Sequence, residues 1–159
     1  MGSADPSGRL GPDLLTFRCG GRDFAIDIMA VRELRSWSRP TPLPHAPRYM
    51  LGVVNLRGSV LPVMDLACRL GTGPTPDAPR NVIIVIETGR HLIGLLVEAV
   101  SDIVHPTSGQ LQDIPDNAGD VDGDLSDQIL VTADRMIQIL STEGFLPARV
   151  ETGADPEPA

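Results

Sequence analysis

Residues 52–66 read GVVNLRGSVLPVMDL, and this stretch decides the fold. Two apolar runs, Gly52–Asn55 and Val60–Val63, flank the four residues Leu56–Ser59. Two short apolar runs joined by so few residues, with a glycine among them, are typical of a β-hairpin. The sequence therefore predicts two neighbouring antiparallel strands here.

The segment before this hairpin is rich in proline. Pro42, Pro44 and Pro47 lie within six residues and stiffen an extended connection. Gly52 and Gly58 permit close backbone approach or a positive φ. We therefore expect a rigid strap that leads into a tightly packed hairpin.

The turn of the hairpin contains Arg57, an arginine in otherwise apolar surroundings. A guanidinium held there needs a partner, and its planar fork suits a carboxylate. Glu33 is an attractive partner. Two interpretations stay open: an Arg–Glu clamp that only orders the turn, and a recognition surface for another protein.

Other short apolar segments, separated by turn signals, predict further strands. The expected hairpins pair Leu15–Cys19 with Phe24–Ile28, Asn81–Glu87 with His91–Val97, and Gln128–Thr132 with Met136–Ser141. We also expect a turn of helix at Met29–Leu34, short helices at Asp65–Leu70 (capped by Asp65 and ended by Gly71) and Thr142–Val150, a strand at Glu98–His105, and a loop over 106–124. Many short strands and few helices favour small β-barrels over a doubly wound sheet.

A weak internal repeat relates the two halves of the chain. Gly21-Arg22 is followed by Val31, Glu33 and Leu34, and Gly89-Arg90 is followed at similar spacing by Val100, Asp102 and Ile103. A strand–turn–strand pattern over Val54–Val63 also recurs over Val131–Leu140. The simplest interpretation is two similar halves of about five strands each, packed together because each is too small for a good core.

Composition limits the function classes. The chain has 159 residues, a formal net charge of −8 and no lysine. The missing lysine excludes a lysine nucleophile, a Schiff base and a phosphate-loop lysine, and no basic patch points to nucleic acid. No apolar run reaches the length of a membrane span, and no signal peptide is visible, so we expect no membrane insertion.

Metal and catalytic motifs are missing. The three histidines, His45, His91 and His105, are not at metal-ligand spacing. The acidic run Asp120–Asp124 fails as an EF-hand loop, because positions 6 and 12 would be Leu125 and Val131. We therefore expect no enzyme activity, no metal and no cofactor.

The expected organisation is one folded domain over residues 13–150. Residues 1–12 are rich in Gly, Ser and Pro, and residues 151–159 form an acidic, proline-containing tail, so we expect both ends to be disordered. Cys19 and Cys68 each lie beside an apolar run, which predicts buried free thiols.

The chain resembles the CheW family, which includes CheW itself and the CheW-like domains of CheV and of the kinase CheA. The resemblance covers about residues 14–147. It is carried by Phe24-Ala25-Ile26, Val31–Leu34, Leu43-Pro44-x-x-Pro47, residues 52–58, residues 60–66, residues 94–100 and Asp134–Ile137. The motif residues that identify the family most specifically are Asn55, Leu56, Gly58, Pro62 and Asp65.

The resemblance implies a mainly β fold of two intertwined, five-stranded SH3-like β-barrel subdomains with short helices. It implies a non-catalytic chemotaxis adaptor that links chemoreceptors to the histidine kinase CheA in a cytoplasmic, membrane-associated receptor array. The implied partners are the CheW-like regulatory domain of CheA and the cytoplasmic tip of the receptors, with other CheW copies as a further candidate. Nucleic acid is not among them.

The resemblance also implies a receptor-binding site in the groove between the two halves. The matching positions are Val31, Glu33, Leu51, Gly52 and Arg57. Val31 and Leu51 would make apolar contact with receptor helices, and Arg57 would order the groove or pair with a receptor carboxylate. The kinase domain would bind by barrel-to-barrel packing of exposed strand edges.

Alternatives from other classes remain. A small hydrolase or metal enzyme is disfavoured by the missing motifs. A CheV-like protein and a kinase fragment are disfavoured because neither a receiver domain nor an ATP-binding domain is visible. A decoy scaffold that binds receptor or kinase, but not both, stays open.

Overall fold

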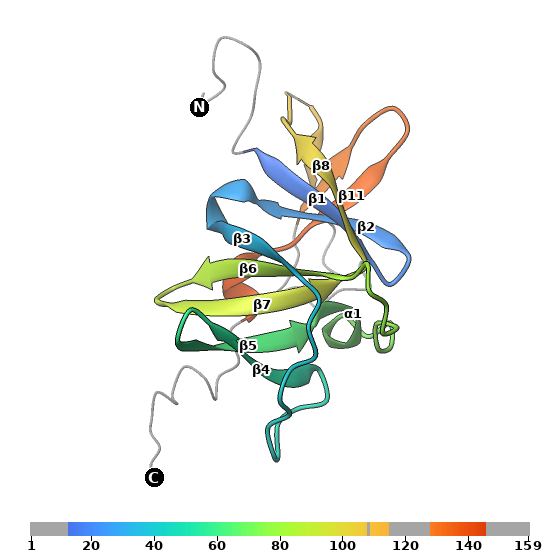
Figure 1. Cartoon of the computed structure of the whole chain (residues 1–159). Coiled ribbons are helices and arrows are strands. Elements are labelled where there is room, and N and C mark those ends of the chain that lie inside the picture. The colour runs from blue at the N-terminus through green and yellow to red at the C-terminus, as the bar shows by residue number, and fades with distance from the viewer. Residues whose placement is uncertain (1–12, 108, 115–127, 146–159) are drawn as a thin grey trace.

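The computed structural model describes residues 13–107, 109–114 and 128–145, and this part of the chain is mainly β (Figure 1). The strands are β1 (Leu14–Cys19), β2 (Arg22–Asp27), β3 (Val31–Ser36), β4 (Met50–Leu56), β5 (Ser59–Asp65), β6 (Val82–Thr88), β7 (His91–Val97), β8 (Ala99–Val104), β9 (Leu111–Asp113), β10 (Gln128–Val131) and β11 (Met136–Ile139). The helical elements are η1 (Ile28–Ala30), α1 (Leu66–Arg69) and η2 (Thr142–Phe145).

The strands form two sheets, which we name the lower and the upper sheet after their places in Figure 1. The lower sheet has the order β3-β6-β7-β5-β4, and the upper sheet has the order β8-β1-β2-β11-β10-β9. Neighbouring strands are antiparallel except for the pairs β5–β7 and β2–β11. Each sheet thus joins two hairpins through one parallel contact.

Each half of the chain contributes to both sheets. Strands β1 and β2 belong to the upper sheet, but β3 crosses to the lower sheet and pairs with β6; β8 makes the reciprocal crossing and pairs with β1. The two sheet orders correspond strand by strand. In that order, β3, β6, β7, β5 and β4 of the lower sheet match β8, β1, β2, β11 and β10 of the upper sheet. The prediction of a mainly β fold of two intertwined barrels is confirmed, with β9 as a sixth strand in the upper sheet.

Three apolar clusters hold the fold together. The largest lies between the sheets and contains Leu15, Phe17, Phe24, Ile26, Met64, Ile84, Ile86, Ile93, Leu95, Val97 and Phe145, among others. The interior of the lower barrel contains Leu56, Leu61, Val63, Ile83, Val85 and Leu96, and that of the upper barrel contains Leu14, Ala25, Leu130 and Ile137. Strand alternation sends one face of each sheet to its barrel interior and the other to the shared core.

The hairpin of residues 52–66 shows why its sequence suits a tight turn. Leu56 pairs with Ser59, so Arg57 and Gly58 form a two-residue loop with positive φ values of 50° and 89°. Turns of this kind need both central residues in the left-handed region. The side chain of Asn55 accepts a hydrogen bond from the Gly58 amide at 2.8 Å, which stabilises this geometry.

The structure corrects three expectations. The turn of helix expected over Met29–Leu34 is a 3-10 turn that ends at Ala30, and β3 follows from Val31 because its alternating side chains fit an edge strand beside β6. The loop over 106–124 contains β9, which pairs with β10. Of the helix expected at Thr142–Val150, the described part is the 3-10 turn η2.

Other expectations lie outside the described residues. They concern the expected disorder of residues 1–12 and 151–159 and the acidic run Asp120–Asp124.

Candidate functional site

Glu33 and Arg57 form an ion pair that joins the two edges of the lower sheet. Glu33 lies on edge strand β3, opposite Val85 of the barrel interior, so its side chain turns into the barrel. Arg57 Nη1 donates to Glu33 Oε1 at 3.2 Å from the turn that follows the other edge strand, β4. The pair therefore acts as a clasp across the mouth of the curled sheet.

The clasp is unequally exposed and only partly satisfied. The Arg57 side chain is 71% exposed and that of Glu33 is 26% exposed. Arg35 Nη1 lies 3.7 Å from Glu33 Oε2, at ion-pair distance, but Glu33 Oε2 and Arg35 Nε are buried without a hydrogen bond. Arg57 thus keeps N–H donors directed to solvent, whereas the Glu33 carboxylate is directed into the barrel.

A β-bulge separates the roles of Val31 and Glu33. Val31 pairs with Ile86, which faces the core between the sheets, and Glu33 pairs with Val85, which faces the barrel interior. Without a bulge, residues two apart on a strand would share one face. The extra residue in β3 turns Val31 to the intersheet core, where it is partly buried, while Glu33 reaches Arg57.

Leu51 and Gly52 lie on the opposite edge of the lower sheet, beneath the strap of residues 37–49. Gly52 has φ +145°, and an added Cβ there would lie 2.1 Å from the Thr41 carbonyl oxygen. Thr41 and Val53 exchange two backbone hydrogen bonds of 2.8 and 2.9 Å. Gly52 is therefore the residue that lets the strap pack against β4.

Leu51 is partly buried and packs against the lower-barrel cluster, as Trp37 does, and it lines a pocket of about 300 Å³ beneath the strap. The structure thus brings Glu33 and Arg57 together and places Val31 on the other face of β3. It places Leu51 and Gly52 at the far edge, where the strap covers Gly52.

The remaining motif residues order the hairpin and the helix after it. Leu56 is buried in the lower barrel. Pro62 faces Val53, whose amide and carbonyl are directed to Thr41, so the missing proline amide costs the β4–β5 ladder no bond. Asp65 is 2% exposed, caps α1 and accepts two bonds from Thr75 at 2.6 and 2.8 Å.

Sequence reasoning did not assign a site role to Leu34, Val100 or Ile103. Leu34 pairs with Ile84 and Ile103 pairs with Leu15, so both side chains lie on the sheet faces that build the intersheet core. They are nevertheless 48% and 50% exposed, because β3 and β8 are edge strands. The internal repeat, which matches Val31 and Leu34 to Val100 and Ile103, was the signal that could have found them.

These four residues form what we name the edge-strand strip: Val31, Leu34, Val100 and Ile103. Val31 and Val100 are partly buried at the margin of the intersheet core, and the other two continue it to the surface. In Figure 1 both edge strands lie on the near side of the molecule, β3 in front of β6 and β8 in front of β1. The strip is thus apolar surface contributed by both sheets.

The titratable groups show no metal-binding arrangement in the described part of the chain. No three His, Cys, Asp or Glu side chains there gather as a metal site. His105 Nδ1 lies 2.7 Å from Asp13 Oδ1, and both cysteines are free. Cys19 is buried as predicted, but the prediction that Cys68 is buried is wrong, because it is partly exposed. Burial, reinforced by Asp65 and Glu98, raises the pKa of the Cys19 thiol to about 12. No described helix has the length and apolar character needed to cross a membrane.

The family model described as the CheW-like domain matches residues 13–150 of the chain. The chain belongs to the CheW family. It is 46% identical over 133 residues to a probable chemotaxis protein CheW of Rhizobium etli, covering 84% of this chain and 86% of that protein. It is 42% identical over 144 residues to the chemotaxis protein CheW of Rhizobium meliloti, covering 91% and 93%.

A solved CheW structure shares the fold. The scaffolding protein TtCheW of Thermoanaerobacter tengcongensis superposes with a TM-score of 0.80 at 26% identity, covering 89% of this chain and 96% of that one. The exchange of β3 and β8 between the sheets therefore belongs to the architecture of a CheW-like domain.

Proposed function

We propose that this CheW-like chain is an adaptor that links chemoreceptors to the histidine kinase CheA in a cytoplasmic signalling array, without catalysis of its own. Family membership supports the proposal, as do the names of its relatives, which are chemotaxis proteins and a scaffolding protein. The structural observation that supports the proposal most is the edge-strand strip. The strip exposes apolar side chains that are continuous with the intersheet core, and it lies beside the Glu33–Arg57 clasp.

The receptor's cytoplasmic tip, a helical hairpin, is the proposed occupant of the strip. An amphipathic helix binds by laying spaced apolar side chains against an apolar surface. Val31 from one sheet and Ile103 from the other would contact the same helix face. The candidate positions Leu51 and Gly52 would act indirectly, because Leu51 packs against the lower-barrel cluster beneath the strap and Gly52 holds the strap against β4.

The sequence left two interpretations of Arg57 open, a clamp that orders the turn and a recognition surface, and Arg57 fits both. Its bond to Glu33 orders the mouth of the lower barrel, and its exposed guanidinium retains donors for a second carboxylate. We propose that a receptor carboxylate uses these donors. The CheW-like regulatory domain of CheA would bind elsewhere, by packing barrel against barrel.

The test is co-sedimentation of the purified chain with receptor signalling domains and CheA, separately and together. Wild type is compared with Arg57→Ala and Glu33→Ala. We expect wild type to sediment with both partners and both variants to lose receptor binding in part. Binding to neither partner would refute the adaptor function, and binding to one partner alone would favour the decoy scaffold.

A further inference from the structure

The apolar side chains of the edge-strand strip are related by an approximate two-fold symmetry. Strand β3 of the lower sheet corresponds to β8 of the upper sheet, and each has one extra residue relative to its neighbour. The extra residue lies between Val31 and Glu33 in β3 and between Val100 and Ile103 in β8. Val31 thus matches Val100, and Leu34 matches Ile103. Apolar contacts with this strip alone would accept a helix in either of two opposite directions.

A second acid–arginine pair lies at the corresponding place in the upper sheet. The counterpart of Glu33 is Asp102, whose carboxylate accepts a hydrogen bond from the buried hydroxyl of Thr16. Thr16 pairs with Ala25 of the upper-barrel interior, so Asp102 is turned toward its own barrel, as Glu33 is toward the lower one. Arg135, at the end of the β10–β11 turn, has Nη1 3.9 Å from Asp102 Oδ1. We name Asp102 and Arg135 the upper pair.

The exposures of acid and base are inverted between the clasp and the upper pair. In the clasp the Arg57 side chain is 71% exposed and the Glu33 side chain 26%. In the upper pair the Asp102 side chain is 55% exposed and the Arg135 side chain 31%. The strip is therefore bordered by an exposed guanidinium on the side of the lower barrel and by an exposed carboxylate on the side of the upper barrel.

The neighbouring charges are inverted as well. Glu33 lies 3.2 and 3.7 Å from two guanidinium groups, whereas Arg135 lies between two carboxylates, Asp23 at 4.0 Å and Asp102 at 3.9 Å. Asp23 has a further partner in Arg18 at 3.4 Å. Asp102 Oδ2 forms no hydrogen bond with a described residue. Asp102 therefore keeps an acceptor for a partner, as Arg57 keeps donors.

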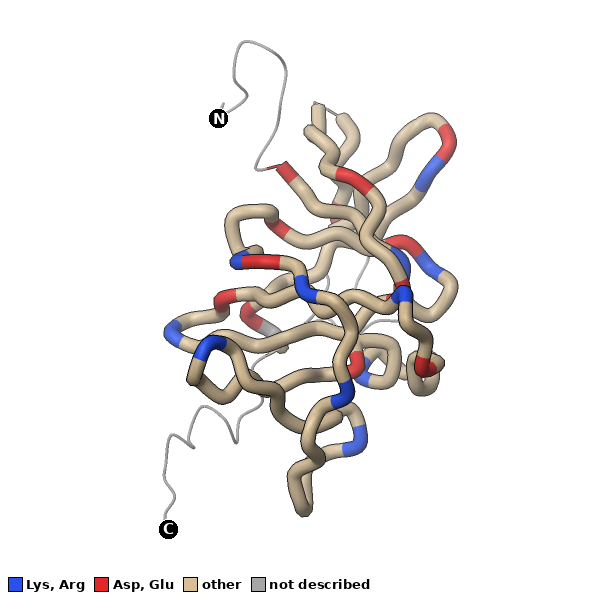
Figure 2. The backbone as a smooth tube through the Cα atoms, in the orientation of Figure 1, with Lys and Arg blue, Asp and Glu red and all other residues tan. Residues whose placement is uncertain are grey.

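The same contrast extends to the two barrels as a whole. Residues 31–97, which form the lower sheet and its connections, contain eight arginines against four carboxylates, a formal charge of +4. The other described residues contain three arginines against eight carboxylates, a formal charge of −5. Figure 2 shows the blue residues concentrated on the lower part of the molecule. The long-range field therefore favours the same direction of binding as the two exposed groups beside the strip.

We propose that the edge-strand strip binds the receptor helix in one direction only, with a carboxylate of the helix at Arg57 and a basic side chain of the same helix at Asp102. This inference rests on the proposed receptor binding and adds its direction. In the reversed direction, like charges would meet on both sides of the strip. Arg57 and Asp102 are then specificity-determining residues. The partner they select is a helix whose apolar face has an acidic residue on one side and a basic residue on the other.

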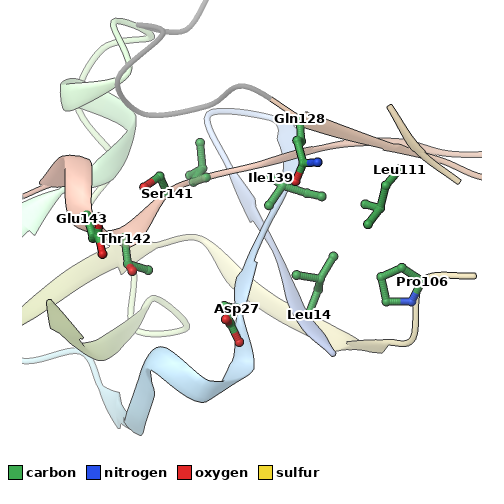
Figure 3. Close-up of a pocket in the computed structure, with 10 residues that line it drawn as sticks. Leu14, Asp27, Pro106, Leu111, Gln128, Ile139, Ser141, Thr142 and Glu143 are labelled. Atoms are coloured by element: carbon green, nitrogen blue, oxygen red, sulfur yellow. The ribbon is translucent and has the colours of Figure 1, made fainter. Parts of the chain in front are cut away.

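Charge reversal at Asp102 tests its contact with the helix. The affinity of a purified receptor signalling domain is measured by calorimetry for wild type, Asp102→Lys and the control Glu143→Lys. Glu143 is exposed and lines a pocket of about 360 Å³, and neither Asp102 nor any strip residue lines that pocket (Figure 3). We expect Asp102→Lys to raise the dissociation constant about tenfold, which corresponds to about 1.4 kcal/mol, and Glu143→Lys to have little effect.

The outcomes separate this inference from the proposed function. Wild-type affinity for Asp102→Lys, or equal losses for Asp102→Lys and Glu143→Lys, would overturn the direction of binding and leave receptor binding in place. A wild-type chain that does not bind the receptor domain would overturn both. If Asp102→Lys does not fold, Asp102→Asn replaces it, because its amide oxygen still accepts the bond from Thr16.

The direction itself is measured with a nitroxide label near one end of the receptor helix, which broadens the amide signals of nearby residues in the isotope-labelled chain. In wild type we expect broadening in one barrel only. The variant Arg57→Ala/Asp102→Asn lacks both exposed charges, so its symmetric strip should bind the helix in both directions and both barrels should broaden. Broadening of both barrels in wild type, or of one barrel in the variant, would contradict the proposal.

Discussion

Arg57 binds Glu33 across the open mouth of the lower sheet, so one ion pair joins the two edge regions of a five-stranded barrel. Its partners are 24 residues apart and belong to elements that share no backbone pairing. The pair can stabilise the barrel, recognise a partner, or do both, and measurements of unfolding and of binding separate these roles.

A double-mutant cycle on this pair measures the clasp. We expect Glu33→Ala and Arg57→Ala to destabilise the chain less than additively when combined, with a coupling of about 0.5–1 kcal/mol, because Arg57 is largely exposed. The measurement is urea unfolding of the four proteins. Strict additivity would show that the clasp contributes nothing to stability and would leave recognition as its role.

Gly52 should be intolerant of any side chain. We expect Gly52→Ala to cost about 2–4 kcal/mol of unfolding free energy, because the new Cβ would meet the Thr41 carbonyl oxygen at 2.1 Å. Gly58→Ala is the control: its φ is also positive, at 89°, but nothing lies within 4 Å, so about 1 kcal/mol is expected. Similar losses in the two variants would contradict the role of Gly52 under the strap.

Asp65 should anchor the segment after α1. We expect Asp65→Asn to cost about 1–3 kcal/mol, because the amide nitrogen that replaces one carboxylate oxygen cannot accept one of the two bonds from Thr75 in this buried site. Asp134→Asn, at an exposed position in the β10–β11 turn, should be nearly neutral. Thermal unfolding of both variants checks this, and equal melting temperatures would contradict it.

Much of the fold could be predicted because its hairpins carry local signals. The turns at Gly20-Gly21, Arg57-Gly58 and Gly89-Arg90 all contain glycine at positive φ, and the strands beside them were located within a few residues. The first residues of β3 were predicted as part of a helical turn, because whether Val31–Ser36 extends depends on β6, a strand from the other half of the chain. The exchange of β3 and β8 between the sheets likewise depends on tertiary contacts and leaves no local pattern in the sequence.

The candidate site was predicted in part for similar reasons. Charge complementarity was enough to pair Glu33 with Arg57. The bulge in β3 could not be read from the sequence, so Val31 and Glu33 were expected on one surface, and the structure places them on opposite faces. The internal repeat matches Leu34 to Ile103, but their exposure follows only from the positions of β3 and β8 at the sheet edges.

The two cysteines should differ in reactivity. Cys19 is 1% exposed and its pKa is raised to about 12, whereas Cys68 is partly exposed. We expect iodoacetamide to modify Cys68 in the folded chain and Cys19 only after unfolding. Peptide mass mapping after short exposures decides this, and early modification of Cys19 would contradict the burial.

The raised pKa of the Cys19 thiol predicts that the folded chain loses stability at high pH. The pKa of Cys19 is about 12 in the folded chain and about 8.5 when unfolded, so the stabilising contribution is complete below about pH 8.5 and declines as pH rises toward 12. We expect the unfolding free energy to fall more between about pH 8 and 10 in wild type than in Cys19→Ala. Parallel pH profiles would argue against a buried neutral thiol.

The most direct test is the affinity of a purified receptor signalling domain for Ile103→Glu and Met136→Glu, measured by calorimetry. Both substitutions place a carboxylate at an exposed apolar residue, 50% and 66% exposed, but only Ile103 belongs to the edge-strand strip. We expect a loss of about tenfold or more for Ile103→Glu and wild-type affinity for Met136→Glu. Wild-type affinity for Ile103→Glu, in a folded protein, would contradict it.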